Sequence, residues 1–346
     1  MANRGLLGDG RMSPQRTEQR VAQNLPRISI VSPVYGCASC LEELVDRIAT
    51  ALARRPEQFE VILVDDRSRD GAWARITELA ANRPWLRALR LSRNFGQHQA
   101  ILAGLQASRG DWVVVMDCDL QDSPAAIPAL LAHAEAQALD FVVALRQHRK
   151  DRWHKRLASA MFYRLLSWLT GMAQDSRASN FGIYCRRMVD AIAAMPEQGL
   201  AFPLMVRWIG FAGGTLEVEH APRHSGTSTY GFRKLLRLAT NIALGYSDKP
   251  LRLVATGGIV FSVFAFVLVA VSIYRWWQGD IQVAGFTSII ASIWLVAGAL
   301  MVALGVVGLY VGQVFRNAQG RPRFVIDRRL GEGPDDSVRP QGEPRG

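Results

Sequence analysis

Apolar runs and helical patterns alternate along the first part of the chain. Short runs rich in β-branched residues are separated by segments in which apolar residues recur every three or four positions. Continuous apolar runs between amphipathic helices are typical of an α/β domain with a mostly parallel sheet that helices cover on both faces. The pattern predicts strands at 27–35, 59–66, 86–92, 111–119 and 140–146, and helices at 41–52, 71–81, 96–108 and 124–136.

Two long uncharged stretches follow nearer the C-terminus. No charged residue occurs from Leu253 to Tyr274, a length close to the roughly 20 residues with which a helix crosses a bilayer. The second stretch, Ile281 to Phe315, is too long for one straight span, and we place its membrane part near 287–311. Buried helices of a large soluble protein are the alternative, but two such runs side by side favour a transmembrane hairpin.

Positive charge predicts the orientation of this hairpin. The net charge is +11, and basic residues flank the outer ends of the hairpin, whereas its connection "RWWQGDIQ" carries only Arg275. Loops rich in Lys and Arg stay in the cytoplasm, so we expect the first 250 or so residues to be cytoplasmic. Because the basic residues concentrate beside membrane segments, we expect a membrane partner and no nucleic acid. The flanking residues are Arg233, Lys234, Arg237, Lys249, Arg252, Arg316, Arg321 and Arg323.

Basic amphipathic segments near 149–169 and 231–250 are predicted to lie at the membrane interface, although a solvated surface helix is the alternative for the first. The hairpin also leaves room for a homo-oligomer, a dimer or a tetramer. The N-terminal segment lacks the apolar core of a secretory signal. The predicted parts are a disordered arm (1–26), the α/β domain (27–230), an interfacial helix (231–250), two transmembrane helices (251–313) and a cytoplasmic tail (314–346).

Acidic residues gather where predicted strands end. In a parallel sheet, ligands bind beyond the carboxyl ends of the strands. The usual phosphate-binding loops G-x-G-x-x-G and G-x-x-x-x-G-K-[ST] are both absent. Acidic strand ends suit a different solution, in which carboxylates hold Mg²⁺ or Mn²⁺ and the metal holds a diphosphate. The residues at these ends are Pro33, Tyr35, Asp65, Asp66, Asp117 and Asp119.

The cysteines carry little signal in the sequence. Cys37 and Cys40 form one C-x-x-C, and no second pair stands at zinc spacing. We therefore interpret them as reduced, small residues at a strand-to-helix turn. Cys118 is interpreted as a spacer between Asp117 and Asp119, with its side chain on the opposite side.

A set of motifs resembles one enzyme family over about residues 27–325. They are "VSPVYG", "VDDRSRDG", "LSRNFGQHQAILAGL", "MDCDLQD", "RHSGTSTY" and "GLYVGQVFRNAQGRPRFVID". The sequence resembles the polyprenyl-phosphate glycosyltransferases of glycosyltransferase family 2. The resemblance implies a GT-A nucleotide-sugar-binding domain and inverting transfer of a sugar from a nucleotide sugar, with uracil favoured over guanine. The implied acceptor is a polyprenyl phosphate, undecaprenyl phosphate, at the cytoplasmic face of the bacterial inner membrane.

The resemblance also implies roles for the donor-site residues. Pro33 and Tyr35 match the loop that borders the nucleobase, and Asp66 matches the carboxylate that reads it. Asp65 is open to two interpretations, direct contact or support of a turn. The implied metal ligands are Asp117, which also faces the nucleotide sugar, Asp119 and Gln121. Asp122 is expected to cap the following helix.

For the acceptor phosphate, the resemblance implies Arg146 and Arg156, because guanidinium groups bind phosphate in a bidentate manner. Arg223, Ser228 and Tyr230 of "RHSGTSTY" can also donate to phosphate.

One departure from the family concerns the catalytic base. Many relatives carry Asp where this chain has Asn180, and Asp175 is the nearest spare carboxylate. A phosphate acceptor is already ionised near neutral pH and needs no base, whereas a sugar hydroxyl would. We therefore expect Asn180 to fit a phosphate acceptor, with an altered donor or activity as the alternative. Asp175 is kept as the candidate base beside the catalytic Asp117, Asp119 and Arg156.

Two other functions are weighed against this one. A processive polysaccharide synthase would carry Q-x-x-R-W, but Leu204 stands where Gln should precede Arg207 and Trp208. A membrane-anchored protein that binds nucleotide sugars or lipid phosphates without turnover is favoured only by Asn180, and the acidic pair argues against it.

Overall fold

The computed structural model describes residues 26–53, 58–146, 178–195, 201–218, 249–278 and 285–331. These residues fall into two compact units. The first unit contains the described residues up to 218 together with 322–331, and the second contains two long helices. The predicted arm (1–26, except its last residue) and most of the predicted interfacial helix (231–250) lie outside the described residues.

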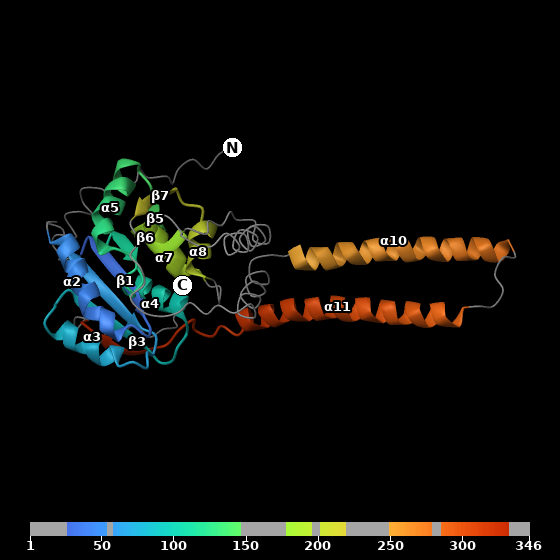
Figure 1. The fold of residues 1–346 in the computed structure, drawn as a ribbon, viewed down its shortest axis with the longest axis horizontal. Coiled ribbons are helices and arrows are strands. Elements are labelled where there is room, and N and C mark those ends of the chain that lie inside the picture. The colour runs from blue at the N-terminus through green and yellow to red at the C-terminus, as the bar shows by residue number, and fades with distance from the viewer. Residues whose placement is uncertain are drawn as a thin grey trace, which may run out of the picture. The chain divides into compact units, whose positions relative to one another are not determined.

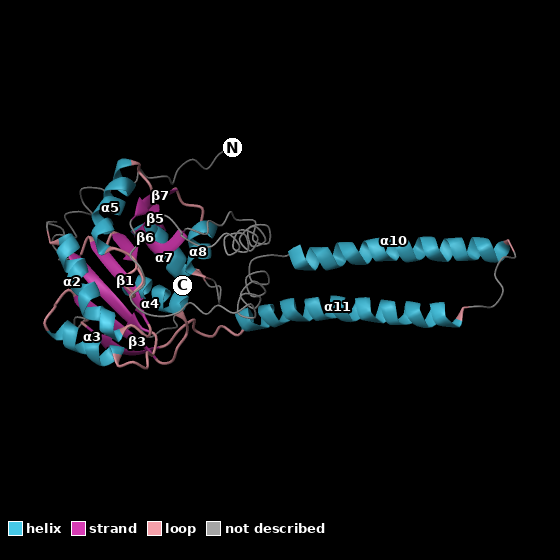
Figure 2. Cartoon of the chain, in the orientation of Figure 1, coloured by secondary structure: helices cyan, strands magenta, loops and turns pink. Residues whose placement is uncertain are grey.

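An eight-stranded sheet forms the centre of the first unit (Figures 1 and 2). Its order is β7-β5-β6-β4-β1-β2-β3-β8, and every strand except β6 and β8 points the same way. The predicted mostly parallel sheet is therefore confirmed. The strands are β1 (Ile28–Val34), β2 (Phe59–Asp65), β3 (Leu86–Leu91), β4 (Trp112–Val115), β5 (Phe141–Arg146), β6 (Ala178–Cys185), β7 (Gly213–Val218) and β8 (Ile326–Leu330).

Helices cover both faces of this sheet, as the continuous apolar strands required. Side chains such as Ile30 and Val61 share one core with the helices of the first face. On the other face α4 approaches β1 so closely that a Cβ at Gly104 would lie 2.3 Å from Val31 Cγ1. The first face holds α2 (Leu41–Leu52), α3 (Ala72–Ala81) and α5 (Ile127–Ala136); the other holds α4 (Gln97–Ala107), α7 (Arg186–Ala194) and α8 (Phe202–Trp208).

The fourth strand is shorter than predicted. Its pairing with β1 ends at Val31 and Val115, so the strand expected at 111–119 stops before the acidic pair. Met116 donates its backbone N–H to Val31 O (3.1 Å) as the last link of this ladder. Asp117 and Asp119 therefore belong to a loop, which frees their side chains from the alternation of a strand.

The chain returns to the sheet after the second long helix. Residues 326–330, predicted as part of the tail, form β8 antiparallel to β3. Arg67 Nη1 pairs with Asp327 Oδ2 at 2.8 Å, and Arg323 Nη2 donates to Ala193 O at 2.7 Å. The prediction of a tail missed this strand because a short, charged edge strand has no apolar pattern. The remainder of the tail, from residue 332, lies outside the described residues.

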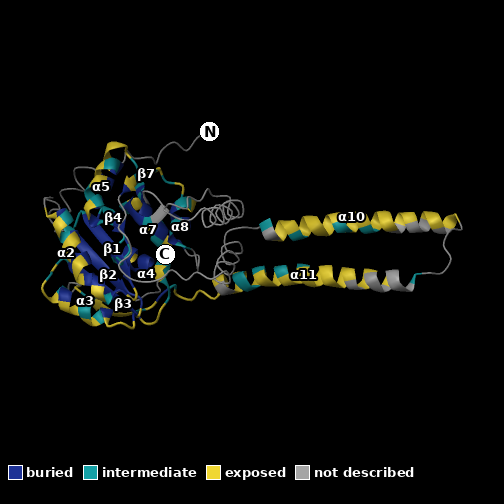
Figure 3. Cartoon of the chain, viewed as in Figure 1, coloured by how far each residue is buried: buried dark blue, intermediate teal, exposed yellow. Residues whose placement is uncertain are grey.

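The second unit contains α10 (Lys249–Trp277) and α11 (Phe286–Ala318), which lie side by side (Figure 1). Their stretches Leu251–Leu268 and Leu295–Phe315 are long and apolar enough to cross a membrane. These stretches are not buried within the protein, and most described side chains along them are exposed (Figure 3). Long apolar helices whose side chains stay mostly exposed indicate association with a membrane.

A buried ion pair fastens the end of the sheet opposite the acidic loops. Arg87 Nη1 lies 2.7 Å from Glu60 Oε2, and both residues are less than a tenth exposed. Glu60 Oε1 also accepts from Ser29 Oγ (2.6 Å) and from the backbone N–H of Arg109 (2.8 Å). One carboxylate thus joins β1, β2, β3 and the segment before β4.

We expect Arg87→Ala to lower the free energy of unfolding by about 3–5 kcal/mol, because it leaves the Glu60 carboxylate buried without its cation. Thermal unfolding of the purified protein, followed by tryptophan fluorescence, measures the change. Arg75→Ala is the matched control, since Arg75 pairs with Glu78 on the exposed surface and such pairs contribute little. Equal losses in both variants would contradict a structural role for the buried pair.

Candidate active site

The sheet reverses its direction of growth between β1 and β4. The chain adds β2 and β3 on one side of β1 and then places β4 on the other side. In an open parallel sheet, such a reversal leaves a crevice beyond the carboxyl ends of the two central strands, where ligands bind. Tyr35 follows β1 and the pair Asp117 and Asp119 follows β4, so the predicted nucleobase loop and metal loop meet at this point.

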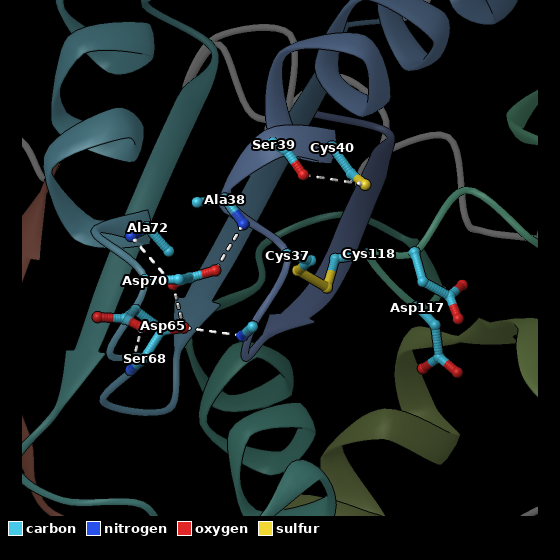
Figure 4. Close-up of a disulfide and its surroundings, with 12 residues drawn as sticks. Cys37, Ala38, Ser39, Cys40, Asp65, Ser68, Asp70, Ala72, Asp117 and Cys118 are labelled. Carbon is cyan, nitrogen blue, oxygen red and sulfur yellow. Dashed lines mark hydrogen bonds between the residues drawn. A yellow bond between two sulfur atoms is a disulfide. The ribbon is translucent and has the colours of Figure 1, made fainter. Parts of the chain in front are cut away.

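A disulfide joins these two loops (Figure 4). Cys37 and Cys118 are bonded, with their Cα atoms 6.5 Å apart. The prediction that these cysteines are reduced, and that Cys118 is only a spacer, is wrong for this pair. Figure 4 shows Cys118 directed at Cys37 and Asp117 directed away from it, as expected for its orientation. Cys40 and Cys185 have free thiols.

The loop after β1 is anchored to the loop after β2 by hydrogen bonds (Figure 4). Gly36 N donates to Ser68 Oγ (2.8 Å), Ser68 Oγ donates to Asp70 Oδ1 (2.5 Å), and Ala38 N donates to Asp70 Oδ2 (2.8 Å). Burial opposes ionisation of Asp70, but the hydrogen bonds from Ser68 and Ala38 outweigh it and lower the pKa of this carboxyl. An ionised Asp70 therefore holds the loop from which Tyr35 projects.

The two predicted base-loop residues differ in exposure. Pro33 is buried within β1, level with Val64 of β2. Tyr35 is 53% exposed just after the strand. The aromatic ring is thus the part of this loop that is accessible to a base, and Pro33 supports it from within the sheet.

Asp65 and Asp66 both bind backbone amides. Asp65 Oδ1 accepts from Ser68 N (2.8 Å), which supports the interpretation of Asp65 as a turn residue. Asp66 Oδ1 accepts from Phe95 N (2.7 Å) and Oδ2 from Gly96 N (2.8 Å). Burial raises the pKa of the Asp66 carboxyl, and these amide hydrogen bonds oppose that rise. Asp66 thereby fixes the start of α4; its contact with a nucleobase stays a prediction.

The metal loop turns sharply at Leu120, whose φ of 61° lies in the left-handed region. This conformation is costly for a residue with a side chain, and burial of Leu120 in the core offsets the cost. The turn lets Gln121 N donate to Asp119 Oδ1 (3.2 Å). Asp122 accepts from Asp117 N (3.3 Å), so it braces this loop, and the structure shows no side-chain cap at Ser123, where the helix begins.

Gln97 was not assigned a role from the sequence. It opens α4 directly after Gly96, and its Nε2 donates to Asp117 Oδ1. Asp66, the start of α4 and Asp117 are therefore linked in one hydrogen-bonded series. The only sequence signal was a polar residue in the first turn of a helix that follows a strand at this edge of the sheet.

Asp117, Asp119 and Gln121 are all partly buried in the loop that follows β4, at the reversal of the sheet. Among the described residues there is no group of three or more His, Cys, Asp and Glu side chains that could hold a metal. Mg²⁺ in particular keeps several waters and binds one or two carboxylates plus substrate phosphates. The residues present thus fit a metal that arrives with a diphosphate and do not form an all-protein cage.

Only some of the residues predicted for the acceptor site and the catalytic base lie among the described residues. Arg146 ends β5 level with Val218 of β7, at the same edge of the sheet as the acidic loops. The pairing of β4 with β6 ends at Val115 and Gly182, and Asn180 lies in β6 two residues before Gly182, at the edge of the sheet where the chain leaves β4 for Asp117. The other predicted residues, Arg156, Asp175, Arg223, Ser228 and Tyr230, lie outside the described residues.

Residues 29–193 match the model of the family described as glycosyl transferase family 2. The chain is 34% identical over 315 residues to undecaprenyl-phosphate 4-deoxy-4-formamido-L-arabinose transferase of Proteus mirabilis (strain HI4320), covering 89% of this chain and 95% of that protein. The protein of the same name from Shewanella sediminis (strain HAW-EB3) is 33% identical over 322 residues, covering 90% and 95%.

Among solved structures, the mannosyltransferase PcManGT from Pyrobaculum calidifontis, in complex with GDP-Man and Mn²⁺, is similar with a TM-score of 0.47 at 14% identity. That match covers 86% of this chain and 88% of the other. The similarity to these curated relatives extends over most of both chains. The chain therefore belongs to glycosyl transferase family 2 and is a glycosyltransferase with a GT-A-like α/β fold.

Proposed function

We propose that this enzyme transfers a sugar, with inversion, from a UDP-linked nucleotide sugar to undecaprenyl phosphate at the cytoplasmic face of the bacterial inner membrane. The observation that carries the proposal is the presence in one chain of an acidic loop at the reversal of the sheet and two membrane-length apolar helices. The first suits a nucleoside diphosphate, and the second suits an acceptor that cannot leave the bilayer. The curated relatives named above are undecaprenyl-phosphate sugar transferases.

The donor end of the reaction depends on the acidic loop. Asp117, Asp119 and Gln121 would hold Mg²⁺ or Mn²⁺, which supplies Lewis-acid neutralisation of the leaving diphosphate. Gln97 fixes the Asp117 side chain by donating to its Oδ1. Tyr35 offers an exposed ring against the base, and Asp66 lies at the adjacent strand end.

The acceptor end needs little acid–base chemistry. A phosphate monoester is largely ionised near neutral pH, so its oxygen can attack the anomeric carbon without a general base. Asn180, in the strand next to β4, is consistent with this, because a neutral amide does not repel an anionic acceptor. We assign phosphate binding to Arg146, Arg156, Arg223, Ser228 and Tyr230, with Asp175 retained as a candidate base for a different acceptor.

Membranes containing the enzyme, incubated with undecaprenyl phosphate and radiolabelled nucleotide sugars, test the proposal. The donor panel includes UDP- and GDP-linked hexoses and UDP-4-deoxy-4-formamido-L-arabinose. We expect one UDP-linked donor to give a labelled lipid that forms only when undecaprenyl phosphate is added. A labelled polymer would favour a processive synthase, and no labelled product from any donor would favour a binding protein without turnover.

Asp119→Asn should lower the rate of transfer by at least ~100-fold, because it removes a charge that holds the metal against the diphosphate. The rate is measured with saturating donor over a range of Mn²⁺ concentrations. Asp190→Asn, an exposed aspartate of α7 paired with Arg186, is the matched control and should retain activity. Full activity of the unaltered enzyme in EDTA would reject the metal-dependent mechanism.

Gln97→Ala should raise the metal concentration needed for half-maximal activity about 10- to 100-fold, the usual effect of losing a group that orients a metal ligand. The rate at saturating metal should change less. Gln106→Ala, at the far end of the same helix, serves as control because its side chain donates to Ala193 O away from the acidic loop. If both variants have the metal dependence of the unaltered enzyme, Gln97 does not position Asp117.

A further inference from the structure

We propose that the Cys37–Cys118 disulfide is a positioning element of the donor site, so that donor binding depends on its redox state. This inference rests on the proposed function, because it assigns the two loops to the nucleotide and the metal. The bond lies at the reversal of the sheet and joins residues that are 81 positions apart in sequence. Tyr35 is two residues before Cys37, and Asp117 and Asp119 flank Cys118.

The disulfide lies just beyond the point where backbone pairing between β1 and β4 ends. Pairing between β1 and β4 ends at Val31 and Val115, whereas β1 continues to Val34. Met116 adds one further backbone hydrogen bond to Val31. Beyond that point, the covalent bond takes over as the link between the metal loop and the loop that carries Tyr35.

The Cys37 end of the disulfide lies in a loop that hydrogen bonds hold in place. The loop that contains Cys37 is bound on either side by Gly36 N to Ser68 Oγ and Ala38 N to Asp70 Oδ2, each at 2.8 Å. Cys118 is therefore bonded to a loop that the turn after β2 already holds in place. The bond transmits that order to Asp117 and Asp119, which adjoin Cys118 in the chain.

The oxidised form is the competent one. Both sulfurs are buried, and Asp117 points away from them (Figure 4). Asp117 and Asp119 are half-exposed with the bond in place, so the disulfide does not block the metal ligands. A bond that leaves the ligands accessible while restricting their loop lowers the ordering entropy that donor binding must otherwise overcome.

Reduction of the disulfide by a dithiol removes this restriction of the loop. A thiolate of the dithiol attacks one sulfur of the pair, the other leaves as a thiolate and takes up a proton, and the second thiol of the reductant resolves the mixed disulfide. Two electrons pass from the dithiol, which ends as a disulfide, to Cys37 and Cys118, which end as two thiols. Re-formation requires a disulfide or hydroperoxide oxidant.

The test begins with the full-length protein purified in detergent under air. Thiols are alkylated, the disulfide is located by peptide mass mapping, and donor KM and kcat are then measured with Mg²⁺ before and after reduction. A trialkylphosphine serves as reductant because thiols would bind the metal. We expect reduction to raise the donor KM about tenfold, the factor that corresponds to ordering roughly one backbone residue, with a smaller change in kcat.

Cysteine variants identify the bond responsible. Cys37→Ala and Cys118→Ala should each show the high KM and no response to the phosphine. Cys40→Ala is the matched control, since it removes a free buried thiol three residues from Cys37 and should keep both the low KM and the response. The inference is overturned if the air-purified protein has four free thiols, if mapping finds Cys37 bonded to Cys40, or if complete reduction leaves the KM of the unaltered enzyme unchanged.

Amide hydrogen exchange separates this inference from the proposed function. Without any substrate, reduction should speed exchange at residues 35–40 and 116–122, and should leave exchange in β2 and β3 unchanged. This result supports the disulfide as a positioning element even if no donor yields a labelled lipid. Unchanged exchange at 116–122 in the fully reduced protein would reject this positioning role, whatever the transfer activity is.

Discussion

The reversal of strand order between β1 and β4 is the constraint on which the site depends. Because β2 and β4 lie on opposite sides of β1, the loops that leave β1 and β4 diverge and leave a crevice at the carboxyl edge. Each loop then needs its own support. The β1 loop is bound to Ser68 and Asp70, and the β4 loop is bound to Gln97 and, through Cys118, to the β1 loop.

The acidic residues at this edge lie in two different loop regions, after β2 and after β4. Asp65, Asp66 and Asp70 accept hydrogen bonds from backbone amides and shape the turns. Asp117 and Asp119 are half-exposed at the crevice. Within the loop that follows β4, Asp117 and Asp119 also accept hydrogen bonds, from Gln97 Nε2 and from the backbone N–H of Gln121. Two accessible carboxylates suit a metal that is shared with a diphosphate, and the membrane-length helices suit a lipid-linked acceptor.

The sequence predicted the alternation of strands and helices well because strands buried on both faces are apolar throughout. Helix α2, for example, begins and ends at the predicted residues 41 and 52. It did not predict β8, whose charged residues lie on an exposed edge, nor the Cys37–Cys118 bond, since no local pattern marks two cysteines 81 residues apart. The contact between Gln97 and Asp117 also depended on three-dimensional proximity. The contacts of Asp66 likewise depended on amides far along the chain, those of Phe95 and Gly96.

The central claim is that the loop at 117–121 binds a divalent metal together with a nucleoside diphosphate. Electron paramagnetic resonance of Mn²⁺, titrated into the full-length protein with and without UDP, measures this directly. We expect tight Mn²⁺ binding only when UDP is present, and loss of that binding in Asp119→Asn. Equal Mn²⁺ binding in the unaltered protein and in Asp119→Asn, with UDP present, would contradict it.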